Sequence, residues 1–236
     1  MSDRLLDETA EPVLDAWKTA LWNGTFSEYV DALIVPLTKK WQDFIAGDDP
    51  VYSMDGDLSV TVPVLMTNFL SFRDLMLAAS IDPDRIDADF VRTQVTRPSS
   101  PSSCNAMERV LVESYHSPLT ESAERRITRA SQAFEAMGNH AEVISYKAMP
   151  YACAAYLAWW SCDGAAALNL GLRSASINDE ITLNDIVLGA IKGAAYPHLV
   201  VDGMASAASD TAAMAQGVDP ADPTVVSGMG PSAPTL

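Results

Sequence analysis

YACAAYLAWWSCDGAAALNLGLRSA, residues 151–175, is the part of this chain whose pattern says most about its architecture. Two apolar runs flank a polar interruption at Cys162, Asp163 and Gly164, which is typical of a tight turn between helices. Four small residues would let two antiparallel helices approach closely: Ala155, Ala158, Ala166 and Ala167. The stretch therefore predicts a helical hairpin.

Apolar residues recur at steps of three and four through most of the chain outside the hairpin, which is the spacing of a buried helix face. Residues 182–193 carry the clearest such stripe. Further helices are expected over residues 12–22, 25–47, 59–80, 83–95, 107–115, 120–138 and 140–162. We predict an all-α fold, an irregular bundle of about seven to ten helices ending in a hairpin that resembles a tetratricopeptide unit.

Several helix ends and breaks can be placed from single residues. Pro12 is expected at a first helical position, where its missing N–H costs nothing. Thr25 and Glu28 have the spacing of a capping box, and Pro36 should kink or break the helix that follows. Asp82 is the expected cap of the helix over 83–95.

The domain organisation follows from two changes in composition. Residues 97–103 (RPSSPSS) form the clearest candidate hinge within a helical domain over residues 1–200. In residues 201–236, 27 of 36 residues are Ala, Ser, Gly, Pro, Thr or Asp, and none is aromatic or basic. Such a segment cannot bury enough apolar surface to offset its ordering entropy, so we predict a disordered tail.

Charge and hydropathy exclude several classes of function. The net charge of −16, from 31 acidic and 15 basic residues, argues against nucleic-acid or anionic-membrane partners. The longest charge-free stretches before the tail are shorter than the roughly 20 residues of a spanning helix, so no membrane association is expected. No secretory signal is recognisable, and the three cysteines lack C-x-x-C spacing. We therefore expect a cytoplasmic protein.

A search for reactive groups nominates no catalytic, cofactor-binding or metal-binding residue, and no cofactor is expected. No two of the three histidines lie within four residues of each other, and no phosphate-binding or nucleophile-elbow motif occurs. Asp55 and Asp57 lack the remaining ligands of an EF-hand, so a turn role is expected for them. The carboxylate of Asp163 should raise the pKa of the Cys162 thiol, which argues against a nucleophile.

The basic cluster Arg125, Arg126 and Arg129 has two interpretations. Glu121 stands four residues before Arg125, an order that favours an ion pair on a helix surface. A solvated helix face is therefore the simpler interpretation. A site for a small anion or an acidic partner is the alternative.

Four further residues attract attention because they interrupt or crowd apolar helices. Arg73 and Asp74 lie in an apolar run and, as neighbours, should point apart, so we expect them to anchor other segments through charge-assisted bonds. Trp159 and Trp160 are consecutive and cannot both point into one core. One of them should lie at a groove edge or interface, unless it packs against another helix.

The hairpin also resembles an actinobacterial family known only as a domain of unknown function. The family pattern A-W-L-A-W-x-x-G-D-G is matched here except that Tyr156 replaces its first Trp and Cys162 its first Gly. The upstream FLSFRDLML, residues 69–77, is similar to a leucine-rich helix with an R-D pair in the same family. The matching positions of the pattern are Ala155, Leu157, Ala158, Trp159, Asp163 and Gly164.

The resemblance covers about residues 25–197 and corresponds to the family's C-terminal helical half. The family's N-terminal α/β half has no counterpart in this sequence, and the family has no assigned chemistry to carry over. The resemblance thus implies one kind of protein partner, a separately encoded α/β segment.

Two functions from different classes remain. We expect a non-catalytic interaction or scaffold module with a partner docking near the hairpin; the alternative is an enzyme lobe or small-ligand domain whose acidic and polar residues converge only in the fold. A pocket containing Asp74 or Asp163 would favour the alternative. An apolar patch beside Trp160 would favour the scaffold.

Overall fold

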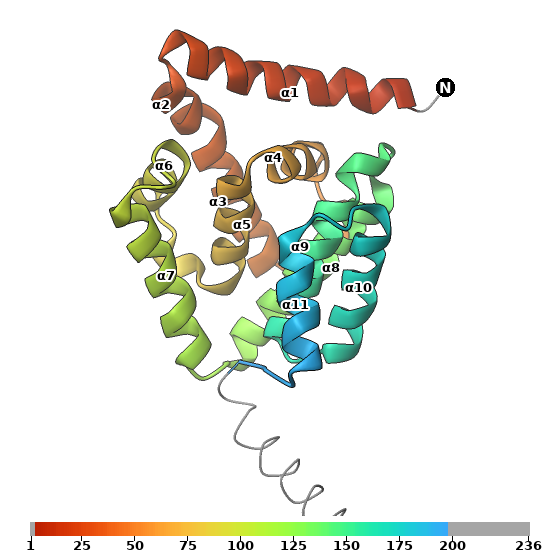
Figure 1. Ribbon diagram of the computed structural model, residues 1–236. Coiled ribbons are helices and arrows are strands. Elements are labelled where there is room, and N and C mark those ends of the chain that lie inside the picture. Colours follow the sequence, from red (N-terminus) through yellow and green to blue (C-terminus); the bar gives the residue numbers. More distant parts are fainter. Residues whose placement is uncertain (1–2, 198–236) are drawn as a thin grey trace, which may run out of the picture. The chain divides into compact units, whose positions relative to one another are not determined.

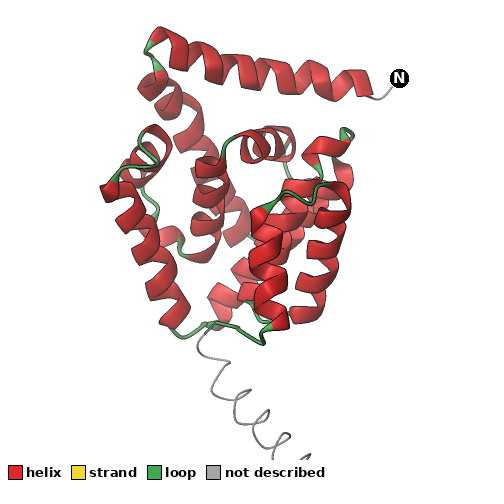
Figure 2. Ribbon diagram, in the orientation of Figure 1, coloured by secondary structure: helices red, strands yellow, loops and turns green. Residues whose placement is uncertain are grey.

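The computed structural model describes residues 3–197, with side chains from residue 10 onward, and every regular element in that range is helical (Figure 1, Figure 2). Ten of its α-helices exceed one turn, and α2 is a single turn. The predicted all-α helical bundle is therefore confirmed for the described residues. The likeness of its hairpin to a tetratricopeptide unit stays a prediction, and the tail assigned to residues 201–236 lies outside the described part of the chain.

The first elements correct two predicted helix starts. They are α1 (Asp3–Asn23), α2 (Phe26–Tyr29), the π-helical turn η1 (Val30–Ile34) and α3 (Val35–Ala46). Pro12 lies inside α1 rather than at its start, because the preceding residues are mostly good helix formers. Thr25 precedes α2 but makes no side-chain capping bond, so the predicted capping box is wrong.

Proline explains two irregular turns. The π-helical turn η1 immediately precedes α3, which has Pro36 in its first turn. A second π-helical turn, η3 (Asp57–Thr61), stands in the same relation to Pro63 at the start of α4. Proline has no N–H to donate to the carbonyl four residues earlier, so the turn before it adopts the wider π-helical pattern, in which N–H groups bond to carbonyls five residues earlier. The irregularity predicted at Pro36 thus takes the form of a π-helical turn.

The middle of the chain is broken more often than its sequence suggested. Its elements are η2 (Val51–Ser53), η3, α4 (Val62–Asn68), α5 (Leu70–Ile81), η4 (Pro83–Arg85) and α6 (Ala88–Thr96). Phe69 is extended, with φ −133° and ψ 101°, so the helix predicted over 59–80 is two helices. The Phe69 ring stacks on Trp17 at 3.8 Å between centroids, and this aromatic contact stabilises the break between the two helices. Asp87, not Asp82, caps α6 by accepting a bond from the Phe90 N–H.

The candidate hinge is shorter than predicted. Helix α7 (Pro101–His116) begins inside the 97–103 segment, with Ser100 as its cap. The buried Ser103 donates its hydroxyl to the carbonyls of Thr93 and Arg97, and its own carbonyl accepts from Gln94. These bonds tie the start of α7 to the end of α6. A hinge function for the segment stays a prediction.

Helix α9 (Ala148–Trp160) lies at the centre of the C-terminal half. The other elements there are α8 (Glu121–His140), η5 (Ile144–Tyr146), α10 (Gly164–Ile177) and α11 (Thr182–Lys192). Figure 1 shows α9, α10 and α11 side by side, and α9 also packs against α8, α4 and α5. Every residue of α9 except Tyr156 is buried. A helix that is apolar all round is expected at such a position.

Gly138 does not end α8, as its sequence position suggested, because the helix continues to His140. The residue serves close packing instead: a Cβ built there would lie 2.7 Å from the Tyr151 ring. The hydroxyl of Tyr151 donates to Asn139 and accepts from Arg173 of α10. Three helices are therefore joined around the position where α8 has no side chain.

Candidate functional site

Both tryptophans of the hairpin are buried, so the expectation that one lies at a surface is wrong. Trp159 is 7 % exposed and Trp160 is 4 % exposed. Trp159 donates its indole N–H to the carbonyl of Ala195 at 2.7 Å, and Trp160 packs edge-on against Tyr115. Consecutive side chains can both be buried here because helices surround α9 on several sides. The alternative of core packing against another helix is thus the correct one.

The turn after α9 is specified by three residues with structural roles. Asp163 caps α10 by accepting a bond from the Ala166 N–H at 2.9 Å. A Cβ on Gly164 would lie 2.5 Å from the Tyr196 hydroxyl oxygen, so a larger residue there would require the end of the Tyr196 side chain to move. Cys162 has a φ of 65°, in the left-handed region that favours glycine, and glycine is the residue of the resembled pattern at this position.

The thiol of Cys162 is poorly suited to nucleophilic chemistry. Burial raises its pKa, and the carboxylate of Glu124 on α8 adds to the shift. The predicted direction was right, but burial and Glu124 are its causes rather than the neighbouring Asp163. Burial also raises the pKa of the Cys153 thiol in α9.

Arg73 and Asp74 pair with each other, contrary to the expectation that they would anchor other segments. Both Nε and Nη2 of Arg73 donate to Oδ1 of Asp74, at 2.8 and 2.7 Å. The arginine side chain is long enough to fold back onto the next residue of the same helix, while Asp74 keeps contact with solvent. Within the described part of the chain, Arg73 has no other ion-pair partner.

Two arginines of α8 bond to helix ends rather than to solvent, so the solvated-face interpretation is wrong for them. Arg126 donates to the carbonyls of Ser80 and Ile81, at 3.1 and 2.8 Å, at the end of α5. Arg129 donates through Nε to the Phe44 carbonyl at 2.9 Å, and its guanidinium lies 4.6 Å from the Phe44 ring centroid. Cations at helix C-termini are stabilised by the helix dipole and by unpaired carbonyls.

Unpaired positive charge remains on the same helix. Arg125 is exposed and forms no ion pair with any described residue, so the predicted pair with Glu121 is not made. Among the residues that the structure describes, the guanidinium of Arg129 also has no carboxylate partner, and its buried Nη2 has no hydrogen bond. These two cations stand one helical turn apart.

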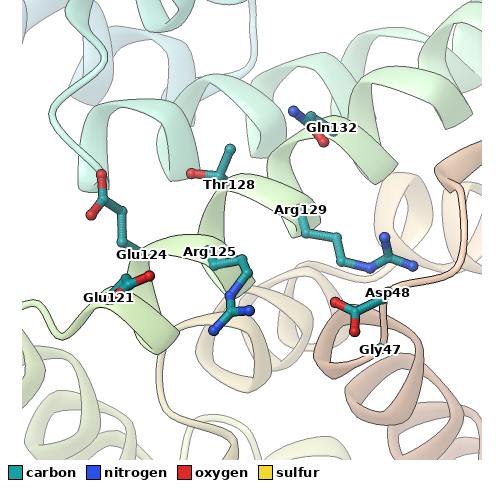
Figure 3. A pocket seen from close by; sticks show the side chains of 8 residues that line it. All are labelled: Gly47, Asp48, Glu121, Glu124, Arg125, Thr128, Arg129 and Gln132. Atoms are coloured by element: carbon teal, nitrogen blue, oxygen red, sulfur yellow. The ribbon is translucent and has the colours of Figure 1, made fainter.

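A polar hollow of about 470 Å³ contains both of them (Figure 3). Arg125 and Arg129, together with Thr128 and Gln132, belong to one face of α8, because they recur at steps of three and four. Across from them lies Asp48, in the turn that follows α3. We call this hollow the α8 pocket; its lining residues are Gly47, Asp48, Glu121, Glu124, Arg125, Thr128, Arg129 and Gln132.

The charges of the α8 pocket are held apart. Figure 3 shows the Asp48 carboxylate facing the two guanidinium groups, but it lies beyond the 4.0 Å of an ion pair from either. The lining side chains are carboxylates, guanidinium groups, a hydroxyl and an amide, which can hold a polar group through charge and hydrogen bonds.

Only part of this pocket could be found from the sequence. The arginines were singled out as a cluster, and the steps from Glu121 to Gln132 would have shown that one polar face continues over three turns. Asp48 and Gly47 carried no signal, since they are about 75 residues away along the chain and meet α8 only in the fold.

Two features were expected to distinguish the functional alternatives: a pocket containing Asp74 or Asp163, and an apolar patch beside Trp160. Neither Asp74 nor Asp163 lines any of three cavities on the described surface. The exposed leucines of the hairpin are Leu168 and Leu172, which border a shallow hollow on α10 rather than the surroundings of Trp160. A partner that docked near the hairpin would therefore not contact Trp160, which is buried.

Residues 3–197 hold neither a cluster of metal ligands nor a helix able to cross a membrane. No three His, Cys, Asp or Glu side chains gather there as metal ligands. Lys40 places its ammonium 2.5 Å from Asp55 and 2.9 Å from Asp57, so a protein cation already occupies that acidic turn. No helix in this range combines the length and the apolar character that crossing a bilayer requires.

The chain was compared with protein-family models, with curated proteins and with solved structures, and none of the three comparisons yields a match.

Proposed function

We propose that this chain is a non-catalytic helical interaction module that holds a partner protein at the α8 pocket. The observation that carries the proposal is the pair Arg125 and Arg129: two cations one turn apart in a hollow, neither paired with a carboxylate of residues 3–197. Arg129 also donates to the Phe44 carbonyl, so it serves both the fold and the pocket, whereas both described bonds of Arg126 serve the fold alone.

The electrostatics of the chain favour this location. Its net charge is −16, so most of its surface repels acidic groups. Two unpaired guanidinium groups in a hollow form a local exception, and such contrasts steer association and select partners. Arginine also suits the purpose because its planar donors can bond to a carboxylate bidentately, which applies to Arg125, whereas Nε of Arg129 already donates to the Phe44 carbonyl.

The shape of the pocket favours a protein over a small molecule. Its volume of about 470 Å³ would accommodate a metabolite, but seven of its eight lining residues have a charged or polar side chain. Small-ligand sites are mostly apolar and enclose their ligand. A polar, open hollow is closer to the wet rim and anchor contacts of a protein interface. The small-ligand alternative therefore ranks second.

The resemblance of the hairpin adds one candidate for the partner. The resembled pattern belongs to the family's C-terminal helical half, so a separately encoded segment like the family's α/β half is one partner to test. The proposal does not depend on this identity, because it rests on the charges of α8.

Affinity capture from native lysate tests the proposal. The bait is the full chain, compared with Arg125→Glu and with the matched control Arg109→Glu. Arg109 is an exposed arginine of α7 that likewise has no ion pair among the described residues. We expect a protein retained by the wild type and by the Arg109 variant but lost with Arg125→Glu. Equal retention by all three baits, or by none, would reject the pocket as the docking site.

A further inference from the structure

The order of charges along α8 points to the chemistry of the partner, an inference that rests on the proposed function. Glu121 and Glu124 stand at the N-terminal end of the pocket, and Arg125 and Arg129 follow. Asp48 faces the arginine end. That end thus carries two positive charges against one negative charge, and the glutamate end carries two negative charges.

A ligand of a single sign is disfavoured by this arrangement. The five charged side chains that line the pocket sum to −1, and the whole chain carries −16, so a simple anion gains little. A simple cation would be attracted by the glutamates but repelled by two guanidinium groups. A ligand with both signs can pair with each end.

The length of the polar face sets the size of that ligand. From Glu121 to Gln132 the axis of α8 advances about 16 Å at ~1.5 Å per residue. An extended peptide of about five residues covers the same distance at ~3.3 Å per residue. A free amino acid would span only a fraction of it.

The spacing of the two charged ends sets the pattern within the peptide. The middle of the glutamate pair and the middle of the arginine pair are about 7 Å apart along the helix axis, at ~1.5 Å per residue. In an extended chain, residues i and i+2 lie about 6.6 Å apart and point to the same side. The two distances agree.

We infer that the α8 pocket binds an extended segment of the partner in which an acidic and a basic residue stand two positions apart. The acidic side chain pairs with Arg125 and Arg129, and the basic side chain pairs with Glu121 and Glu124. Thr128 and Gln132 supply uncharged hydrogen-bonding groups along the same face.

Peptide titration followed by NMR of the isotope-labelled full chain tests the inference, because chemical shifts detect millimolar binding. The probe is acetyl-Gly-Glu-Gly-Lys-Gly-amide, and the controls are the same peptide with two glutamates and with two lysines. We expect the mixed peptide to shift the Thr128 amide and the Arg125 side-chain resonances. Each control should bind roughly two- to five-fold more weakly, since one of its charges meets a like charge.

The variant Arg125→Glu should lose the response while keeping the peak dispersion of a folded chain, and Arg109→Glu should keep the response. Equal binding of the three peptides, binding unaffected by Arg125→Glu, or no shift at millimolar peptide would overturn the inference. If capture depends on Arg125 but the peptides are not distinguished, the interaction function stands and the charge pattern is wrong. If the mixed peptide binds selectively but no protein is captured, the charge pattern stands and the proposed function fails.

Discussion

The α9–α10 hairpin and the polar face of α8 use unusual residues for opposite purposes. In the hairpin, the Trp159 indole donates a hydrogen bond to the Ala195 carbonyl, and Asp163 caps α10. Gly164 lies close to the Tyr196 hydroxyl. On α8, Arg125 has no partner at all within the described residues. The unusual residues of the hairpin are already occupied by contacts within the fold. A charged side chain such as Arg125 can still bind a partner, because no described residue pairs with it.

Gly138→Ala should show the strongest dependence on close packing. The new methyl group would meet the Tyr151 ring at 2.7 Å, and that ring cannot move freely because its hydroxyl bonds to Asn139 and Arg173. We expect a loss of about 2–3 kcal/mol in the free energy of unfolding, measured by denaturant titration. The matched control is Gly189→Ala in α11, where nothing lies within 4 Å of the new Cβ.

The control should gain about 0.5–1 kcal/mol, because alanine is the better helix former. Opposite signs for the two variants would show that the packing of Tyr151, in the hairpin, against α8 depends on the missing side chain at position 138. A stable Gly138→Ala would mean that Tyr151 and its polar partners can shift, and the contrast between the two regions would weaken.

Arg125 and Arg126 are neighbours on α8, but replacing each by alanine should change the stability of the protein by different amounts. Arg126→Ala removes two bonds to the end of α5 and should cost about 1–2 kcal/mol. Arg125→Ala should change stability by less than about 0.5 kcal/mol. With about 3 °C per kcal/mol for a domain of this size, thermal melting separates the two. Similar melting temperatures would contradict the division of labour on α8.

Cys162→Gly should give the smallest effect, and it should be stabilising. A non-glycine residue at φ 65° costs about 1 kcal/mol, and the flexibility of glycine in the unfolded chain cancels part of the gain. We expect a net increase of about 0.5 kcal/mol, followed by the same denaturant titration. Cys162→Ala keeps the strained backbone and removes only the thiol, so a gain of equal size in that variant would count against backbone strain as the cause.

Much of the fold could be predicted from local patterns. The helical spacing of 182–193, the helix over 120–138 and the turn at Cys162, Asp163 and Gly164 all correspond to observed features. The errors lie where distant contacts override a local signal. Phe69 breaks a helix in order to stack on Trp17, and that contact could not be read from either segment alone.

The pairings of charged residues were the least predictable part. Sequence spacing suggested that Arg125 pairs with Glu121 and that Arg73 cannot pair with Asp74. In the described residues Arg125 forms no ion pair, and Arg73 does pair with Asp74. Long side chains reach whatever acceptor the fold brings near them, so one-dimensional distance is a poor guide to their partners.

The sequence by itself determined that this chain is helical, acidic and built around an apolar hairpin, because periodicity and composition act through neighbouring residues. Only the tertiary structure decided which charges are used and which are left over. Arg126 and Arg129 meet the ends of α5 and α3, while Arg125 and Asp48 face each other across a hollow without pairing. A helix end becomes an acceptor for a distant arginine only after packing has brought the two together.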